Sequence, residues 1–274
     1  MSATITAQDI NKLRQATGAG MMDCRKALTE SNGDFEGAID WLRKQGQKVA
    51  AKRSDREAKE GVVIATSFNG NQSGIVLCIS CETDFVSKNA EFVAFAQGIA
   101  DAAVANNVKT AEELNEVEIG GAKVADMIND KLAAIGEKIA ISRFDRVDAP
   151  YVASYIHGAN RMGVLVGMNE AAETAGKDVA MQIAAMNPIA LDAEGISADL
   201  LAREKDIAIE QIKAEGKPAE MAEKIAAGKI NKFVKESALL SQAFVKDGNV
   251  SVGDYLKSVS PTLKVSEFKR VALG

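Results

Sequence analysis

Two stretches of the chain repeat each other. Residues 62–77 align without gaps with residues 151–166, which places Gly-Ile-Val-Leu of the first copy on Gly-Val-Leu-Val of the second. A further match ends each copy, since residues 141–147 and 265–271 share an aliphatic residue followed by Ser-x-Phe-x-Arg-Val. The sequence therefore predicts a duplicated scaffold with two lobes of similar fold.

One segment lies outside this repeat. Residues 95–100 align with residues 179–184 only after five residues are removed from the first copy. The excess falls in the stretch that holds Thr-Asp-Phe-Val at 83–86. Because a duplicated scaffold repeats its structural residues and a functional element need not repeat, this unmatched segment is the first candidate for function.

The composition is that of a soluble globular protein with two or three cores. The chain has 274 residues, of which 47% are hydrophobic and 26% are charged. A net charge of −5 argues against a general nucleic-acid or anionic-membrane binder. We find no signal-peptide pattern and no apolar run near the roughly 18 residues of a membrane span. We therefore expect a cytoplasmic protein without membrane contact.

The first 46 residues predict three short helices. Thr6 and Asp9 have the spacing of a capping box at the start of the first helix. The second helix is expected to stop at Asn32-Gly33, a pair suited to a left-handed turn. Asp34 can cap the third helix, which we expect to end before Gly46. A bundle this small buries little surface, so we expect it to serve recognition.

A basic segment follows this bundle. Its basic residues are Arg43, Lys44, Lys48, Lys52, Arg53, Arg56 and Lys59. We interpret the segment as a solvated helical linker. The alternative is an RNA contact, although no aromatic residue is interleaved to stack on bases.

Each repeated unit predicts a strand, a tight turn, a second strand, a helix and a later third strand. The turns at residues 69–71 and 158–160 are rich in Gly and Asn, which tolerate positive φ angles. Residues 92–104 have the apolar spacing of a helix. We therefore expect an α+β fold, in which helices cover antiparallel sheets.

The second lobe is interrupted before its last strand by about 75 additional residues. Within them, helical patterns at residues 196–215 and 219–236 are joined by Gly216-Lys217-Pro218. This arrangement predicts an inserted antiparallel helical hairpin. Such a hairpin packs either against a second subunit or within its own chain.

The chain lacks the signatures of an enzyme. No Gly-Lys pair has a glycine five residues upstream, so no phosphate-binding loop is predicted. Cys78 and Cys81 have the spacing of a redox or zinc motif, but Cys78 falls in a predicted strand, where residues three apart point to opposite faces. His157 is the single histidine and aligns with Phe68. We expect no catalytic residue, cofactor or metal site.

The unmatched segment allows two interpretations. In the first, Asp84 caps a helix while Phe85 and Val86 turn inward. In the second, an exposed aromatic side chain beside an exposed acid forms a wedge that fills an apolar pocket of another protein. Only the second interpretation explains why the other lobe lacks the segment.

Two motifs resemble the bacterial elongation factor Ts family. One is Thr-Asp-Phe-Val at 83–86, and the other is Leu-Arg-x-x-Thr-Gly-Ala-Gly-Met-Met-Asp-Cys-x-Lys-Ala-Leu at 13–28. The resemblance covers nearly the whole chain. It implies a guanine-nucleotide exchange factor for elongation factor Tu, the GTPase that delivers aminoacyl-tRNA to ribosomes.

The resemblance also implies roles for single residues. Asp84 and Phe85 would intrude on the partner and disturb its magnesium site, with Thr83 and Val86 completing the segment. Further partner contacts would come from Arg14, Met21, Met22 and His157. The sequence ends at Gly274, just after the last predicted strand, where some family members have an additional C-terminal helix.

We expect four parts in the chain. They are a ubiquitin-associated-like helical module with the basic linker at 1–55, a core N-subdomain at 56–148, a core C-subdomain at 149–195 and 237–274, and the hairpin at 196–236. The hairpin is a possible homodimer contact, and no direct nucleic-acid contact is expected. An adaptor or RNA-binding accessory protein is the alternative function, and a redox enzyme is the third.

Overall fold

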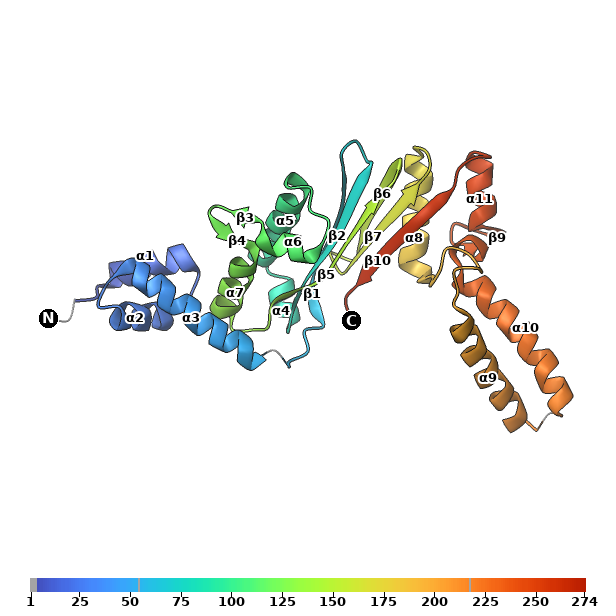
Figure 1. The fold of residues 1–274 in the computed structure, drawn as a ribbon, viewed down its shortest axis with the longest axis horizontal. Coiled ribbons are helices and arrows are strands. Elements are labelled where there is room, and N and C mark those ends of the chain that lie inside the picture. The colour runs from blue at the N-terminus through green and yellow to red at the C-terminus, as the bar shows by residue number, and fades with distance from the viewer. Residues whose placement is uncertain (1–3, 54, 217) are drawn as a thin grey trace.

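The computed structural model describes residues 4–53, 55–216 and 218–274. Residues 1–3 and Ser54 of the predicted N-terminal module, and Lys217 of the predicted hairpin turn, lie outside the described residues. The molecule is elongated, with a helical module at one end, β-sheets in the middle and a pair of long helices at the other end (Figure 1).

The helical module consists of α1 (Ala7–Thr17), α2 (Met21–Glu30) and α3 (Phe35–Arg53). The predicted capping box is confirmed, because the Asp9 N–H donates to Thr6 Oγ1 at 3.2 Å and the Thr6 N–H donates to Asp9 Oδ2 at 3.0 Å. Asn32 and Gly33 have φ angles of 52° and 82° and separate α2 from α3, as expected.

The prediction that the third helix ends before Gly46 is wrong, since α3 continues to Arg53. Gly46 is buried where α3 crosses α7 (Val124–Ile135). A Cβ atom on Gly46 would lie 2.9 Å from the Cβ of Ala133 and 3.4 Å from the carbonyl oxygen of Asn129. The missing side chain therefore lets the two helices approach closely, which joins the helical module to the core.

Two units of similar layout follow. The first unit contains β1 (Glu60–Phe68), β2 (Ser73–Cys81), α4 (Asp84–Ser87), α5 (Ala90–Ala105), α6 (Ala111–Glu116), β3 (Glu118–Ile119), β4 (Ala122–Lys123), α7 and β5 (Ala140–Asp148). The second unit contains β6 (Tyr151–His157), β7 (Met162–Met168), α8 (Glu173–Met186), α9 (Ala198–Ala214), α10 (Ala219–Ser237), the 3-10 helix η1 (Leu239–Ser241), β8 (Ala243–Phe244), β9 (Asp247–Ser251), α11 (Val252–Val259) and β10 (Val265–Ala272).

Each unit holds a three-stranded antiparallel sheet with the same order along the chain. The orders are β1-β2-β5 and β6-β7-β10. Every residue of the turns 69–71 and 158–160 has a positive φ angle, as the sequence predicts for these hairpins. The expected α+β fold with antiparallel sheets is confirmed.

The two sheets pack face to face through equivalent glycines, Gly74 and Gly163. A Cβ atom on Gly163 would lie 2.9 Å from side-chain atoms of both Val63 and Val76, and one on Gly74 would lie 2.8 Å from Val152. Because neither glycine has a side chain, each sheet accommodates the valines of the other. Buried residues of all these strands form one apolar layer between the sheets.

Reciprocal hydrogen bonds join the same two units. The Val63 N–H donates to the carbonyl of Asn160 at 2.7 Å, and the Val152 N–H donates to the carbonyl of Asn71 at 2.6 Å. Val63 and Val152 are aligned positions of the repeat, and so are Asn71 and Asn160. The units are therefore related by an approximate two-fold axis.

Helices cover the outer faces of the two sheets. α5 and α7 bury Phe92, Ile99 and Leu132 against the first sheet. α8 and α11 bury Ile183 and Leu256 against the second. Among the helices within the described ranges, none combines the length and apolar character that a membrane span requires.

The inserted segment is shorter than the sequence predicts. β8, β9 and α11 follow one another as β3, β4 and α7 do in the first unit, so they belong to the repeat and the figure of about 75 additional residues is wrong. The pair that has no counterpart is α9 and α10, which lie side by side (Figure 1). Ala208 and Ile212 of α9 and Ala222 and Ala226 of α10 are buried together.

Candidate functional site

The link between β2 and α5 differs from its counterpart in the second unit. It covers residues 82–89 and contains the one-turn helix α4, whereas residues 169–172 join β7 to α8 without a helix. α4 lies at one edge of the core, beside the strands of the first unit (Figure 1). The residues unmatched in the sequence therefore form an element of their own.

Phe85 is the most exposed large apolar side chain among the described residues, with 86% of its surface accessible. Its neighbour Val86 is half-buried and packs against the core of the first unit. Ser87 is buried and its hydroxyl donates to the carbonyl of Asp84 at 3.2 Å. The turn thus anchors itself through Val86 and Ser87 and holds Phe85 in solvent, so the inward interpretation applies to Val86 alone.

Asp84 lies beside this aromatic ring as a half-exposed carboxylate. Lys88 Nζ donates to Asp84 Oδ2 at 2.6 Å, one helical turn further along. This hydrogen bond and the positive charge of Lys88 lower the pKa of Asp84. The tip of the turn therefore presents an ionised acid next to an apolar ring.

Thr83 is bonded to the protein through each of its polar groups. Its backbone N–H and its hydroxyl donate to the two carboxylate oxygens of Glu137, at 3.0 and 2.7 Å. Its carbonyl accepts from Cys81 Sγ at 3.2 Å and from the Ser87 N–H at 3.3 Å. Glu137 could not be predicted from the sequence, because it lies 54 residues from Thr83 and belongs to no motif.

Glu82, the residue before Thr83, is bonded to two arginines and a backbone amide. Arg53 and Arg56 donate to its two carboxylate oxygens at 2.8 and 3.0 Å, and the Lys138 N–H donates at 2.6 Å. The Lys138 amide first, and then the guanidinium groups of Arg56 and Arg53, lower the pKa of Glu82 to about 2. Because Arg53 ends α3, this carboxylate links the helical module to the base of the α4 turn.

The basic segment pairs largely with acidic side chains of the chain itself. Among its described side chains, the pairs are Arg43 with Asp130, Arg53 and Arg56 with Glu82, and Lys59 with Glu57. The side chain of Lys52 lies outside the described residues. The predicted helical linker is confirmed only as far as Arg53, where α3 ends, because residues 55–59 form neither helix nor strand.

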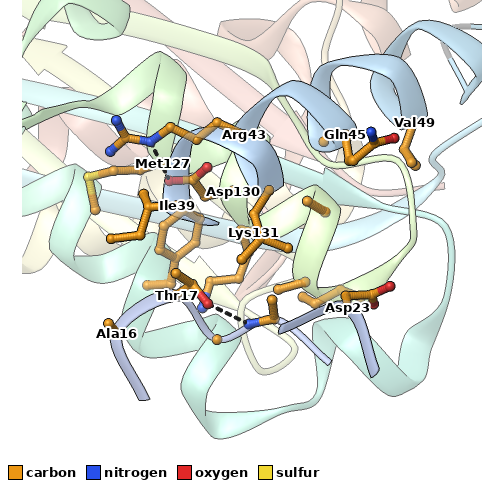
Figure 2. Close-up of a pocket in the computed structure, with 18 of the residues that line it drawn as sticks. Ala16, Thr17, Asp23, Ile39, Arg43, Gln45, Val49, Met127, Asp130 and Lys131 are labelled. Carbon is orange, nitrogen blue, oxygen red and sulfur yellow. Dashed lines mark hydrogen bonds and ion pairs between the residues drawn. The ribbon is translucent and has the colours of Figure 1, made fainter. Parts of the chain in front are cut away.

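A groove of about 810 Å³ lies between the helical module and the helices of the first unit. Its walls come from α1, α2, α3, α5 and α7, and Phe85 and Val86 line it as well. Figure 2 shows the side chains of Arg43 and Asp130, which line the groove, pointing toward each other, and Arg43 Nε lies 3.9 Å from Asp130 Oδ2. Burial raises the pKa of Asp130. The groove therefore opens beside the α4 turn, with Phe85 at its border.

The other candidate residues lie on separate parts of the molecule. Met21 and Met22 begin α2 and are 55% and 73% exposed, and Arg14 is exposed near the end of α1. His157 ends β6 in the second unit, where Tyr155 Oη lies 3.0 Å from His157 Nδ1. The structure therefore distributes these residues along an extended surface instead of gathering them into one pocket.

The cysteine pair lies in the interior. Cys78 faces the layer between the two sheets, while Cys81 faces the outer core of the first unit, as the strand geometry predicts. Burial raises the pKa of both thiols, that of Cys81 to about 12. A reactive redox thiol requires the opposite shift. Over the ranges that the structure describes, no group of three acidic, histidine or cysteine side chains is placed to hold a metal ion.

Comparison with known proteins identifies the family. Residues 82–274 match the family model described as Elongation factor TS. Over 275 residues, the chain is 48% identical to the elongation factor Ts of Christiangramia forsetii, and this covers 99% of the chain and 100% of that protein. The chain belongs to the elongation factor Ts family. The elongation factor Ts of Porphyromonas gingivalis is 43% identical and covers 98% of both chains.

The family match agrees with the motifs found in the sequence. The matched segment begins at Glu82 and includes the α4 turn and most of the duplicated core. The elongation factor Ts of Flavobacterium psychrophilum, 48% identical, covers 99% of the chain and therefore most of the helical module as well. The adaptor and RNA-binding alternatives are not favoured by these relationships.

Proposed function

We propose that this protein is a guanine-nucleotide exchange factor for elongation factor Tu in translation elongation. Membership of the elongation factor Ts family supports this activity. The observation that carries the proposal is the 86% exposed Phe85 on a turn that the duplicated second unit lacks. An exposed aromatic side chain with an acid beside it suits insertion into an apolar pocket of a partner.

The proposed mechanism acts through the partner's metal site. GDP in a GTPase is held largely by its phosphates and by Mg²⁺, so a displaced metal leaves phosphate charge less compensated and the nucleotide more weakly bound. Phe85 would open the partner while Asp84 adds negative charge near the site. Thr83 and Val86 would complete this segment. The factor need not touch the nucleotide.

Exchange then follows from linkage between the two ligands of elongation factor Tu. If the factor lowers the affinity of elongation factor Tu for nucleotide, nucleotide lowers the affinity for the factor to the same degree. Each tenfold change in affinity corresponds to about 1.4 kcal/mol. The factor therefore accelerates both release and rebinding of nucleotide. The more abundant nucleotide determines the product.

We assign supporting contacts to the other candidate residues. Arg14, Met21 and Met22 would bind the GTPase domain from a ubiquitin-associated-like module at 1–55. His157 would contact the rest of the partner from the C-subdomain at 149–195 and 237–274. The exposure of all four side chains supports this assignment.

The hairpin at 196–236 is proposed as a homodimer contact. Ile207 and Met221 are 41% and 54% exposed, on helices that bury Ala208, Ile212, Ala222 and Ala226 against each other. Apolar side chains on a projecting pair of helices suit a contact with a second copy. The core N-subdomain at 56–148 would carry the exchange element.

The test is the rate at which a fluorescent GDP analogue leaves elongation factor Tu. Phe85→Ala should slow the stimulated release about 30-fold, the effect of a contact worth about 2 kcal/mol. Val259→Ala, at a 48% exposed apolar position on α11, serves as the control and should leave release unchanged. Release at the unaltered rate with Phe85→Ala would refute the wedge.

A further inference from the structure

The α4 turn is too short to be stable by itself. An isolated helix needs about 12 residues to be even marginally stable in water, and α4 has 4. Thr83 precedes it at the N-cap position, where a threonine side chain ordinarily accepts a hydrogen bond from the helix backbone. Here the side chain makes no such cap. The orientation of the turn must therefore be fixed by other contacts.

Val86 packs on the core behind the turn, and Glu137 supplies the polar contacts in front of α4. Glu137 follows α7 in the sequence, is half-buried, and accepts from both the N–H and the hydroxyl of Thr83. Two charge-assisted bonds from one carboxylate to one residue fix direction as well as distance. The next residue, Lys138, donates its N–H to Glu82. The link between α7 and β5 therefore hydrogen-bonds to both residues that precede α4, Glu82 and Thr83.

We propose that Glu137 is a positioning residue for nucleotide exchange. Its carboxylate orients Thr83 and thereby sets the direction in which Phe85 enters the partner. The hydroxyl of Thr83 therefore affects exchange through its bond to Glu137 and not through an essential contact of its own with the partner. The inference rests on the proposed exchange function, which it deepens by adding a residue to the same site.

The first experiment separates positioning from affinity. Release of a fluorescent GDP analogue from elongation factor Tu is measured against factor concentration for the wild type, Glu137→Ala and Glu137→Gln. Misplacement of a reacting group by about 1 Å can cost up to 100-fold in rate, and we expect Glu137→Ala to lower the maximal rate about tenfold. The half-saturating concentration should stay within about twofold, because the rest of the contact surface is unchanged.

Two variants sharpen this comparison. Glu137→Gln keeps one acceptor oxygen and should give an intermediate maximal rate. Glu118→Gln, an exposed glutamate on β3, is the matched control and should behave as the wild type. A rise in the half-saturating concentration with an unchanged maximal rate would overturn positioning, since it would make Glu137 a binding contact.

A double-mutant cycle tests the pairing with Thr83. Thr83→Val keeps the branched shape and removes the hydroxyl that donates to Glu137. If Thr83 acts through Glu137, Thr83→Val should slow exchange less in the Glu137→Ala background than in the wild type. Additive losses would mean that Thr83 contacts the partner independently and would overturn the proposal.

Hydrogen exchange of the free protein gives a readout without the partner. Glu137→Ala should speed amide exchange in residues 82–89 about tenfold or more, while β1 and β2 keep wild-type protection. Unchanged protection in residues 82–89 would overturn the proposal that Glu137 holds this segment in place.

The exchange assay separates this inference from the proposed function. If the wild type itself fails to accelerate GDP release, the proposed function is wrong as well. Equal stimulation by the wild type and Glu137→Ala would remove the positioning role alone.

Discussion

Neighbouring residues of the α4 turn divide structural and recognition roles. Thr83 and Ser87 bond to the protein itself, Val86 packs on the core, and only Asp84 and Phe85 project. An exposed phenylalanine contributes little to stability, so the fold gives no reason for its presence. This division is what a preorganised binding tip requires.

Glu82 predicts a pH dependence at the residue scale. Its pKa falls from the ordinary 4.5 to about 2 in the folded protein. A carboxylate with a depressed folded pKa stabilises the fold above its unfolded pKa and loses this effect as the pH falls toward the folded pKa. The stability gap between the wild type and Glu82→Gln should therefore be constant above pH 4.5 and should close toward pH 2.

Urea unfolding of both proteins across this pH range measures the gap directly. Titration of the other acids affects the two proteins alike, so the difference isolates Glu82. A gap that does not change down to pH 2 would contradict the assigned hydrogen bond from the Lys138 N–H and the ion pairs with Arg56 and Arg53.

His157 predicts an effect on affinity without an effect on maximal rate. It lies in the second unit, which has no counterpart of the α4 turn. His157→Ala should raise the half-saturating concentration of the factor about fivefold, the equivalent of one hydrogen bond worth about 1 kcal/mol. The fluorescent GDP assay gives both quantities. A lowered maximal rate would place His157 in the exchange step.

At the scale of elements, local patterns predicted the strands, the hairpin turns and the helices of the module. Asn32 and Gly33, for example, mark the end of α2 by their own backbone preferences. Contacts between distant segments could not be predicted in this way. Gly46 remains helical because Ala133 of α7 lies against it, and Glu137 reaches Thr83 across 54 residues.

The missed part of the repeat has a similar cause. β3 and β4 have two residues each, so they leave almost no periodic pattern in the sequence. Their relation to β8 and β9 becomes visible only when the order of elements in the two units is compared.

The hairpin gives a prediction at this scale. Deleting residues 196–236 and closing the gap with a short Gly-Ser linker should convert a dimer into a monomer, because the proposed contact is removed. Multi-angle light scattering measures the mass. The deletion also removes Leu200 and Leu201, which pack near its base, so the double variant Ile207→Asp and Met221→Asp tests the exposed surface alone. If both variants keep the same number of subunits as the wild type, the dimer contact is excluded.

The whole molecule depends on the close packing of its two sheets. Gly163→Ala would bring a Cβ atom to 2.9 Å from two valine side chains and should destabilise the protein by about 1–3 kcal/mol. Gly98 lies on the exposed side of α5, where an added Cβ atom would meet nothing outside its own helix within 4 Å, so Gly98→Ala should stabilise the protein by up to about 1 kcal/mol. The melting temperature should therefore fall for Gly163→Ala and rise for Gly98→Ala. A raised melting temperature for Gly163→Ala would contradict the tight interface.

A rigid pair of units also explains how one small turn can act on a partner. The approximate two-fold core fixes the α4 turn and His157 in different units relative to each other. Binding through the wide surface can then hold the partner while Phe85 is directed at one place. The ion pair between Arg53 and Glu82 joins the helical module to the start of the α4 turn as well.

The most direct test compares GDP release with Mg²⁺ present and with Mg²⁺ chelated. Elongation factor Tu carrying a fluorescent GDP analogue is mixed with saturating wild-type factor or Phe85→Ala. If the turn acts on the partner's metal site, the wild type should exceed Phe85→Ala about 30-fold with Mg²⁺ present, and this advantage should largely disappear after chelation. An equal advantage under both conditions would contradict the account.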